Sequence, residues 1–315
     1  MLNSEISKLL RFPFADMQTR TSLAARWASV SGASPEERLA ALLAEPRAEE
    51  AMRRLSQNML TLAAGDRAID GIVKDVGRFF AAGMAMTLHA TGGLTLPRLK
   101  QFCTESGLIS PGRARALLLY LRFLRYVEPV PGAKRGGIYV PTVSMRNAWG
   151  AITRAGLDAV QVIEPEIAPI TERLTDPAAL LAFCRIQSEN GRALGTRGMD
   201  NGFWRVFLNR HAGTQILHAL MLSGDDGAHY PPRGEMAFSL SKLARDFHVS
   251  RPHVARMLRA GEKEALLMLC GNSRLSFTDE GRAHLIQLLA ARLGSDLEAA
   301  VRLDAELNAP LRKTA

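Results

Sequence analysis

One order of local signals occurs twice along this chain of 315 residues. Each copy reads helix, helix, helix, strand, turn, strand, helix, with a Ser before its third helix and a Thr before its last. The copies are offset by roughly 140 residues, far longer than the period of a solenoid repeat. The sequence therefore predicts a duplicated domain. The residues in matching roles are Leu96 and Leu240, Ser110 and Ser250, and Thr142 and Thr278.

The first copy is expected within residues 66–163. Apolar residues at helical spacing predict one long helix over 67–89. Caps and glycines then predict two further helices, and a Gly-rich turn joins two strands before the last helix. The signals are Thr95 and Gly107 around the second helix, Ser110 for a helix to Leu124, strands over 126–130 and 137–140, and Thr142 for a helix to about Ile163.

The second copy is expected within residues 203–293. A helix over 203–222 opens it, and Ser239 and Ser250 cap the next two helices. Strands are expected in LLMLC and LSF, joined by the short turn GNSR. The last helix begins at Thr278 and is expected to end near Leu293.

The rest of the chain is expected to be helical. Residues 1–65 read as an N-terminal extension, with a capping box at Ser34 to Glu37 and a helix over 47–62. Residues 164–202 read as a helical connector, with a helix near 177–190 capped by Asp176. Residues 294–315 read as a C-terminal tail or helix.

Composition favours helices. Ala, Leu and Arg recur, aromatic residues make up 6%, and the apolar fraction of 47% is ordinary for a globular protein. Ala, Leu and Arg lose little side-chain freedom in a helix. The sequence thus predicts a mostly α protein with a few short strands.

Charge points to a polyanionic partner. The formal net charge is +9, and Lys and Arg displace the counterions condensed on phosphates. A solvated basic surface without a partner is the alternative, and only the position of the charges decides between them.

The cysteines and histidines predict no disulfide or metal site, and the chain has no pattern of a signal peptide or a membrane span. Cys103, Cys184 and Cys270 lie far apart, which predicts neither disulfides nor a zinc site, and Cys103 and Cys270 fall at expected core positions. The histidines have no metal-ligand spacing, so neither a metal nor a cofactor is expected. The N-terminus lacks a signal-peptide pattern, and no apolar run approaches the roughly 18 residues of a membrane span. We expect a soluble, cytoplasmic, nucleoid-associated protein.

The strongest local pattern lies in residues 239–263. Leu243, Ala244, Val254, Met257 and Leu258 would face inward, and a short turn separates two helices, as a helix-turn-helix requires. The opposite face of the second helix centres on basic residues, and the span has six basic against two acidic residues, a net charge of +4. This outward set is Arg251, Pro252, His253, Arg256, Arg259 and Lys263.

The segment LARDFHVSRPHVARML, followed by strand, turn, strand and TDEGR, resembles the winged helix-turn-helix of MarR-type regulators. The resemblance implies a fold that is mainly α with small β-wings, here as two winged helix-turn-helix domains joined by helical segments. It implies that the recognition helix enters the major groove and that the wing touches the backbone or the minor groove. Carried over, the resemblance implies that Arg251, His253 and Arg256 read bases, that Arg259 and Lys263 contact phosphates, and that Asn272 and Arg274 are wing contacts. Ser250 and Pro252, in the first turn of the same helix, are further candidates for DNA binding.

The first copy matches this pattern less closely. Residues 97–125 have six basic residues against one acidic residue, a net charge of +5. However, Leu117, Leu118 and Leu119 cannot all face one side of a helix, so its second half is expected to pack against another element, such as the helix 67–89. The candidate DNA contacts here are Ser110, Arg113, Arg115, Lys134 and Arg135, the last two at the wing tip.

Three functions remain open. The favoured one is a sequence-specific regulator that binds double-stranded DNA as an intrachain pseudo-dimer, on an asymmetric operator. A plasmid-type replication initiator also resembles two fused winged helices, and a winged-helix adaptor in chromosome organisation would bind protein. Enzyme motifs such as GxGxxG after a strand, GxxxxGK[ST] and GxSxG are absent, so no enzyme is expected. A small-molecule effector or a protein partner is compatible with the sequence, as is a homodimer.

Overall fold

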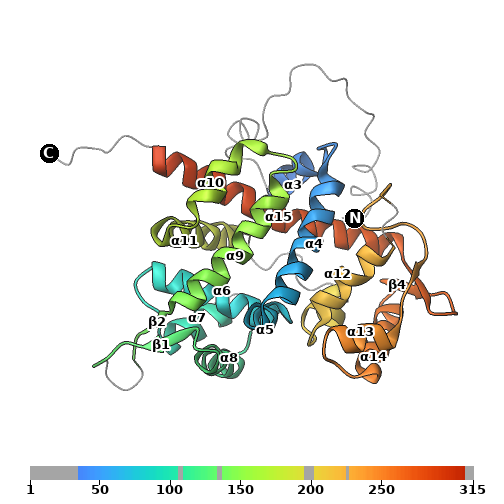
Figure 1. The fold of residues 1–315 in the computed structure, drawn as a ribbon, viewed down its shortest axis with the longest axis horizontal. Helices are drawn as coiled ribbons and strands as arrows, with labels where there is room; N and C mark the ends of the chain where they lie inside the picture. The colour runs from blue at the N-terminus through green and yellow to red at the C-terminus, as the bar shows by residue number, and fades with distance from the viewer. Residues whose placement is uncertain (1–34, 106–108, 133–136, 195–201, 225–226, 309–315) are drawn as a thin grey trace, which may run out of the picture.

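The computed structural model of the chain describes residues 35–105, 109–132, 137–194, 202–224 and 227–308 (Figure 1). Helices dominate this part of the chain, and its strands form two small antiparallel sheets, one of two strands and one of three. The prediction of a mainly α protein with short β elements is therefore confirmed.

The elements of the first copy follow the predicted order. β1 pairs with β2, and Leu94 adds an isolated bridge to Tyr139 of β2. The elements are α5 (Arg67–Val73), α6 (Val76–Ala90), α7 (Leu96–Glu105), α8 (Pro111–Phe123), β1 (Val127–Pro129), β2 (Tyr139–Pro141) and α9 (Val143–Val160).

The second copy repeats that order. Its sheet has the order β3-β5-β4, so that β3 takes the place of the Leu94 bridge. The elements are η2 (Trp204–Leu208, a π-helical turn), α12 (Gly213–Ser223), β3 (Met236–Ala237), α13 (Leu240–Asp246), α14 (Arg251–Lys263), β4 (Leu267–Leu269), β5 (Arg274–Phe277) and α15 (Asp279–Asn308).

Five further elements complete the part of the fold that the structure describes. Asp176 caps α11 as predicted, because its carboxylate accepts the backbone N–H groups of Ala178 and Ala179. Ser34, predicted to open the first helix, lies outside the described residues. The elements are α3 (Pro35–Leu43), α4 (Ala48–Gly65), η1 (Pro165–Ile167), α10 (Ala168–Arg173) and α11 (Pro177–Leu194).

The two copies share a turn and a threonine hydrogen bond as well as the order of their elements. After α8 the chain turns at Arg125 (φ 56°), and after α14 it turns at Ala265 (φ 54°). Each cap threonine then bonds back to the turn residue: Thr142 Oγ1 donates to the Arg125 carbonyl (2.8 Å), and Thr278 Oγ1 donates to the Ala265 carbonyl (2.6 Å). The duplication inferred from the caps thus extends to the details of the helix-to-strand turn.

Two predicted helices are broken, and one is longer than predicted. The helix expected over 67–89 is interrupted before Asp75, which is extended (φ −146°) and caps α6. The helix expected over 203–222 is interrupted at Ala212 (φ 59°), beside Gly213, where a Cβ would meet the Phe207 carbonyl oxygen at 1.9 Å. The last helix continues past Leu293 to Asn308, because its buried residues continue to Leu303 on the larger core.

The two hydrophobic cores are continuous with the helices between the copies. The larger core joins the second copy to α3, α10 and the C-terminal half of α9, and the smaller one lies within α5 to α9. α4 and α11 contribute to both cores, with Leu55 in one and Ala63 in the other for α4. The segments predicted as extension and connector therefore hold the two copies together.

The last helices of the two copies cross at matching positions. Gly156 and Arg292 follow their cap threonines at the same distance along the chain, and a Cβ on Gly156 would meet Arg292 Nη2 at 3.3 Å and Asp296 Oδ2 at 2.3 Å. Asp296 is fully buried, which raises the pKa of its carboxyl, and it accepts from Gln187 (2.6 Å) and Arg292 (2.8 Å). Only a residue without a side chain fits at this crossing.

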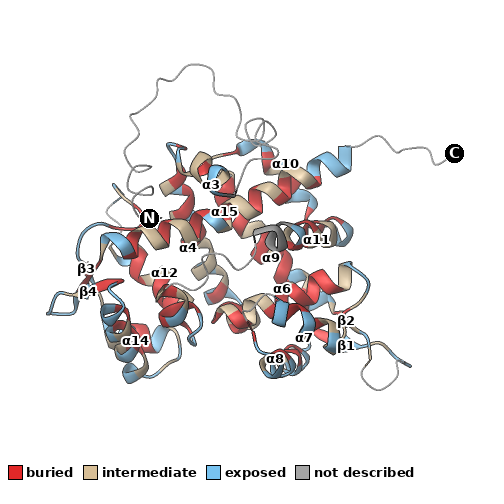
Figure 2. Cartoon of the chain, turned by 180° about the vertical axis from the view of Figure 1, so that it is seen from behind, coloured by how far each residue is buried: buried red, intermediate tan, exposed pale blue. Residues whose placement is uncertain are grey.

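α8 and α14 lie toward one edge of the molecule, and α3 and α10 lie toward the opposite edge, in both views (Figures 1 and 2). The hairpins β1–β2 and β4–β5 lie at the two outer ends of that edge (Figure 1). The order along the edge is thus hairpin, helix, helix, hairpin. Both helices carry exposed residues on their outer turns (Figure 2).

Candidate nucleic-acid interface

The α13–α14 pair has the inward face that the pattern predicted. Leu243 and Ala244 of α13 are buried, and so are Val254, Met257 and Leu258 of α14. Ser250 caps α14 by accepting the His253 backbone N–H at 3.2 Å. Pro follows at the second helical position, where its missing N–H costs nothing. Ser250 therefore orients the helix, and its hydroxyl is engaged in the cap.

The outward face of α14 is exposed and basic. Arg251, Pro252, Arg256, Arg259 and Lys263 are all exposed. Within the described part of the chain, none of the four cationic side chains has a hydrogen-bond or ion-pair partner. Cations that are not paired with carboxylates leave most of their positive potential uncompensated.

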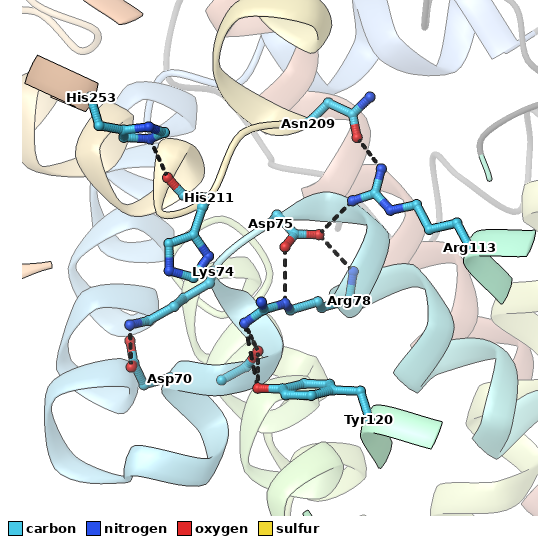
Figure 3. A network of polar contacts seen from close by, with 10 residues as sticks. Asp70, Lys74, Asp75, Arg78, Arg113, Tyr120, Asn209, His211 and His253 are labelled. Carbon is cyan, nitrogen blue, oxygen red and sulfur yellow. Dashed lines mark hydrogen bonds and ion pairs between the residues drawn. The ribbon is translucent and has the colours of Figure 1, made fainter. Parts of the chain in front are cut away.

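His253 does not belong to this outward face. Its side chain is half-buried, and Nε2 lies 3.0 Å from the His211 carbonyl oxygen, in the segment before α12 (Figure 3). The flank position predicted from helical geometry is correct, but the ring is turned to the protein. His253 thus ties the first turn of α14 to residues 209–213.

The hairpin after α14 is short. Its tip contains Gly271, Asn272 and Ser273, all at positive φ, and Asn272 is exposed. Arg274 pairs with Glu235 at 2.7 Å, so its charge is partly compensated. Cys270, predicted as a core residue, is instead exposed, because it lies at the end of β4, where the chain leaves the sheet.

α8 is built in the same way as α14. Ser110 caps it by accepting the Arg113 backbone N–H (3.3 Å). Leu117, Leu118 and Leu121 are buried and face the first copy's core, which includes α6 as predicted. Lys134 and Arg135, the predicted wing contacts, lie outside the described residues.

The outward face of α8 differs from that of α14. With Ser110 aligned to Ser250, the cations of α14 stand where α8 has small or apolar residues. Leu119 is 50% exposed and Phe123 is 81% exposed. The basic residues Arg115 and Arg122 are exposed at other positions, and Arg122 lies over the Tyr139 ring at 5.7 Å. The matched pairs are Arg251 with Pro111, Arg256 with Ala116, Arg259 with Leu119, and Lys263 with Phe123.

Arg113, a predicted DNA contact, faces the junction between the copies. Its Nη1 donates to Asn209 Oδ1 at 2.7 Å and its Nη2 donates to Asp75 Oδ1 at 3.1 Å (Figure 3). Arg113 and His253 occupy the same position after their cap serines, and both bind the segment 209–211. One short segment therefore joins the first turns of α8 and α14.

Asp75 is the acidic centre of this junction. Its side chain is 8% exposed, and it pairs with Arg78 and Arg113, both at 3.1 Å. Nearby, Lys74 pairs with Asp70 at 3.0 Å, and Asp70 also accepts from Gln215 of α12 (2.7 Å). Sequence reasoning missed Asp75, Asn209 and His211, because a continuous helix was expected over 67–89 and another over 203–222. A cap signal at Asp75 was the available clue.

Comparison with known proteins gives no further assignment: no family model, curated protein or solved structure matches the chain. Among the described helices, none is both long and apolar enough to cross a bilayer. In the same residues there is no group of three or more His, Cys, Asp or Glu side chains that could hold a metal ion.

Proposed function

We propose that the chain is a sequence-specific, double-stranded DNA-binding regulator that reads base edges with α14. The observation that carries this proposal is the outward face of α14, where Arg251, Arg256, Arg259 and Lys263 are exposed and have no partner among the described residues. Arg is the side chain best suited to bidentate contact with guanine edges, and Lys and Arg together neutralise phosphates.

The surroundings of α14 support a winged-helix mode of binding. α13 packs behind α14 across a short turn, and the hairpin β4–β5 follows directly, with β3 on the other side of β5. In winged helix-turn-helix proteins the helix enters the major groove and the hairpin contacts the backbone. Arg251 and Arg256 are the proposed base contacts, Arg259 and Lys263 the proposed phosphate contacts, and Asn272 the proposed wing contact.

The two copies are proposed to act as one intrachain pseudo-dimer. Gly156 and Arg292 are matching residues, and a Cβ at Gly156 would meet the Arg292 guanidinium, so the last helices of the two copies approach each other at matching positions, as a twofold arrangement requires. Arg113 and His253 are matching residues that bind one segment. Because the outward faces of α8 and α14 differ, the operator is asymmetric: α14 reads one half, and the first copy follows the other half through backbone contacts of Arg115 and Arg122.

A protein contact is the second candidate role for the first copy. Phe123 and Leu119 are exposed apolar side chains on the outward face of α8, and exposed apolar surface commonly marks an interaction site. This role would make the first copy an adaptor that holds a partner beside DNA bound to α14. It does not replace the proposed role of α14.

A selection from random duplexes tests the proposal. The full-length protein is titrated with a pool of random double-stranded DNA at two salt concentrations, and the retained sequences are read. One asymmetric motif, with affinity falling steeply as salt rises, is expected. Repeats of that motif at a replication origin would instead indicate an initiator. Failure to retain duplex at moderate salt would refute DNA binding.

An Arg256→Ala variant sharpens the same experiment. Arg256 is exposed, so its removal leaves the fold intact, and a loss of about 1–3 kcal/mol is expected with relaxed preference at one base pair. Arg173→Ala, at an exposed position on the opposite edge, is the matched control and leaves the motif unchanged. An equal loss on all sequences would contradict base reading by Arg256.

A further inference from the structure

A cleft lies at the junction between the two copies. It has a volume of about 380 Å³ and is walled by α5, α6, α8 and the segment before α12. This volume is within the range of about 300–1,000 Å³ typical of small-ligand sites. The polar side chains that line it are Arg67, Asp70, Lys74, Arg78, Tyr120 and His211.

Positive charge exceeds negative charge around this cleft. Arg67 is exposed and has no ion-pair partner among the described residues. Asp70 balances Lys74, but Asp75 is shared by Arg78 and Arg113. Three cationic side chains thus line the cleft with one carboxylate, that of Asp70, an excess of two positive charges.

Neutral oxygens leave part of the Arg78 guanidinium available. Its Nη1 donates to the Gly71 carbonyl and the Tyr120 hydroxyl, both at the long distance of 3.4 Å, and its Cζ lies 4.7 Å from the centre of the Tyr120 ring. A charged acceptor forms shorter and stronger hydrogen bonds to a guanidinium than neutral oxygens do. The Tyr120 hydroxyl already donates to the Gly71 carbonyl at 3.3 Å.

We propose that this cleft binds a phosphate group, held by Arg67, Lys74 and Arg78 beside the His211 ring. Phosphate is favoured because it is negatively charged at neutral pH, with about 1.5 to 2 charges as a monoester and one as a backbone diester, and because it accepts several hydrogen bonds at once. Its source is either a small phosphorylated molecule or the DNA backbone. The site goes beyond the proposed function, since phosphate binding is measurable without DNA.

The cleft is placed to affect both outward helices. Tyr120 belongs to α8, and His211 belongs to the segment whose carbonyl oxygen holds His253 of α14 (Figure 3). A ligand that contacts both therefore bears on the relative position of the two helices. Any effect of phosphate on DNA affinity must equal the effect of DNA on phosphate affinity.

His211 reports on occupancy. Burial lowers the pKa of its imidazole, and the positive charges of Arg78 and Lys74 lower it further. Asp75 acts to raise this pKa, and His253 acts to lower it. A bound phosphate brings negative charge beside the ring and raises that pKa. The histidine ring resonances of the full-length protein, titrated with inorganic phosphate and with pyrophosphate, measure this shift, and His211→Gln assigns the signal.

The expected result is a saturable shift of the His211 resonance and a rise in its pKa, with a dissociation constant of about 1 mM or tighter. The exposed His248 should not move. Arg67→Ala removes a direct charged contact and should weaken phosphate binding at least about fivefold, and Arg173→Ala should not weaken it. A linear shift shared by all histidines, or equal affinity in Arg67→Ala, would overturn the site.

DNA titration of the same variants separates the two sources. If the phosphate belongs to DNA, Arg67→Ala weakens DNA binding, the salt slope falls by about 1, and free phosphate competes with duplex. If it belongs to a small molecule, Arg67→Ala keeps its DNA affinity in the absence of phosphate, and phosphate and DNA bind together. Because the phosphate arm needs no DNA, a failure of DNA binding leaves it intact.

Discussion

α8 and α14 have matching backbones and different outward faces. Both begin at a capping serine, both end in a left-handed turn, and both are followed by a hairpin and a threonine-capped helix. On the outward face, however, α14 has arginine and lysine where α8 has alanine, leucine and phenylalanine. A similar net charge over the two segments therefore conceals a difference in where that charge lies.

The difference shows which features a duplicated unit keeps. Caps, turn residues and inward apolar positions are the same in kind because the fold depends on them. Outward positions contribute little to stability and are free to change with function. The second copy thus has a basic outward face, and the first copy has an outward face with exposed leucine and phenylalanine.

Neutralising the α14 face should have the largest effect. The variant Arg256→Ala/Arg259→Ala/Lys263→Ala removes one proposed base contact and two phosphate contacts, and should cost at least about 3 kcal/mol of DNA affinity, or more than 100-fold. Fluorescence anisotropy with the selected duplex measures the loss. The comparison variant Arg115→Ala/Arg122→Ala of α8 should lose less than about tenfold. Equal losses in the two variants would mean that the two copies bind DNA alike.

Transplanting the α14 face onto α8 should have the next largest effect. The variant Ala116→Arg/Leu119→Arg/Phe123→Lys gives α8 the matching cations, and should raise DNA affinity about tenfold and steepen the salt dependence by two to three phosphate contacts, about 2–3 in slope. Salt titration of binding measures both quantities.

A neutral variant at the same positions provides the control. Ala116→Gln/Leu119→Gln/Phe123→Gln removes the apolar surface without adding charge, and its DNA affinity should stay within about twofold of the parent. A large loss in this variant would mean that Leu119 and Phe123 contact DNA directly. No gain in the cationic variant would mean that α8 does not face the duplex.

Loss of one residue at the junction between the copies should have a smaller effect, and it should appear in the free energy of unfolding. Arg113→Ala removes bonds to Asn209 and to the buried Asp75, and should cost about 1 kcal/mol of unfolding free energy, since Asp75 keeps Arg78. Arg113 is about a third exposed, which limits the effect. Urea denaturation measures the cost. Arg115→Ala, exposed and without a partner among the described residues, should cost nothing measurable.

Local patterns in the sequence predicted the elements better than their interruptions. Ser110, Ser250, Thr142 and Thr278 cap helices as expected, because a cap depends on residues within one turn. The break before Asp75 was missed because apolar residues at helical spacing continue across it, although Asp75 is a local cap signal. The ion pair of Asp75 with Arg113 joins residues that are distant in the chain. Contacts of this kind cannot be read from periodicity.

The candidate interface was predictable only where it depends on local spacing along one helix. The outward face of α14 follows from helical spacing, and its exposure is as expected. The net charge of the segment that contains α8 was misleading. It does not show that Arg113 faces the junction between the copies or that Phe123 is exposed. The inward turn of His253 depends on the His211 carbonyl oxygen, which only the folded chain brings near.

The smallest expected effect concerns the turn that the copies share. Arg125 and Ala265 both adopt the left-handed conformation, which costs a non-glycine residue about 1–2 kcal/mol. Arg125→Gly and Ala265→Gly relieve that cost, but glycine also gains freedom in the unfolded chain, so each variant should gain about 0.5 kcal/mol. Thermal denaturation measures the gain, and because both turns have the same geometry, the two gains should agree. A gain at only one position would mean that the two turns, alike in backbone, carry different strain.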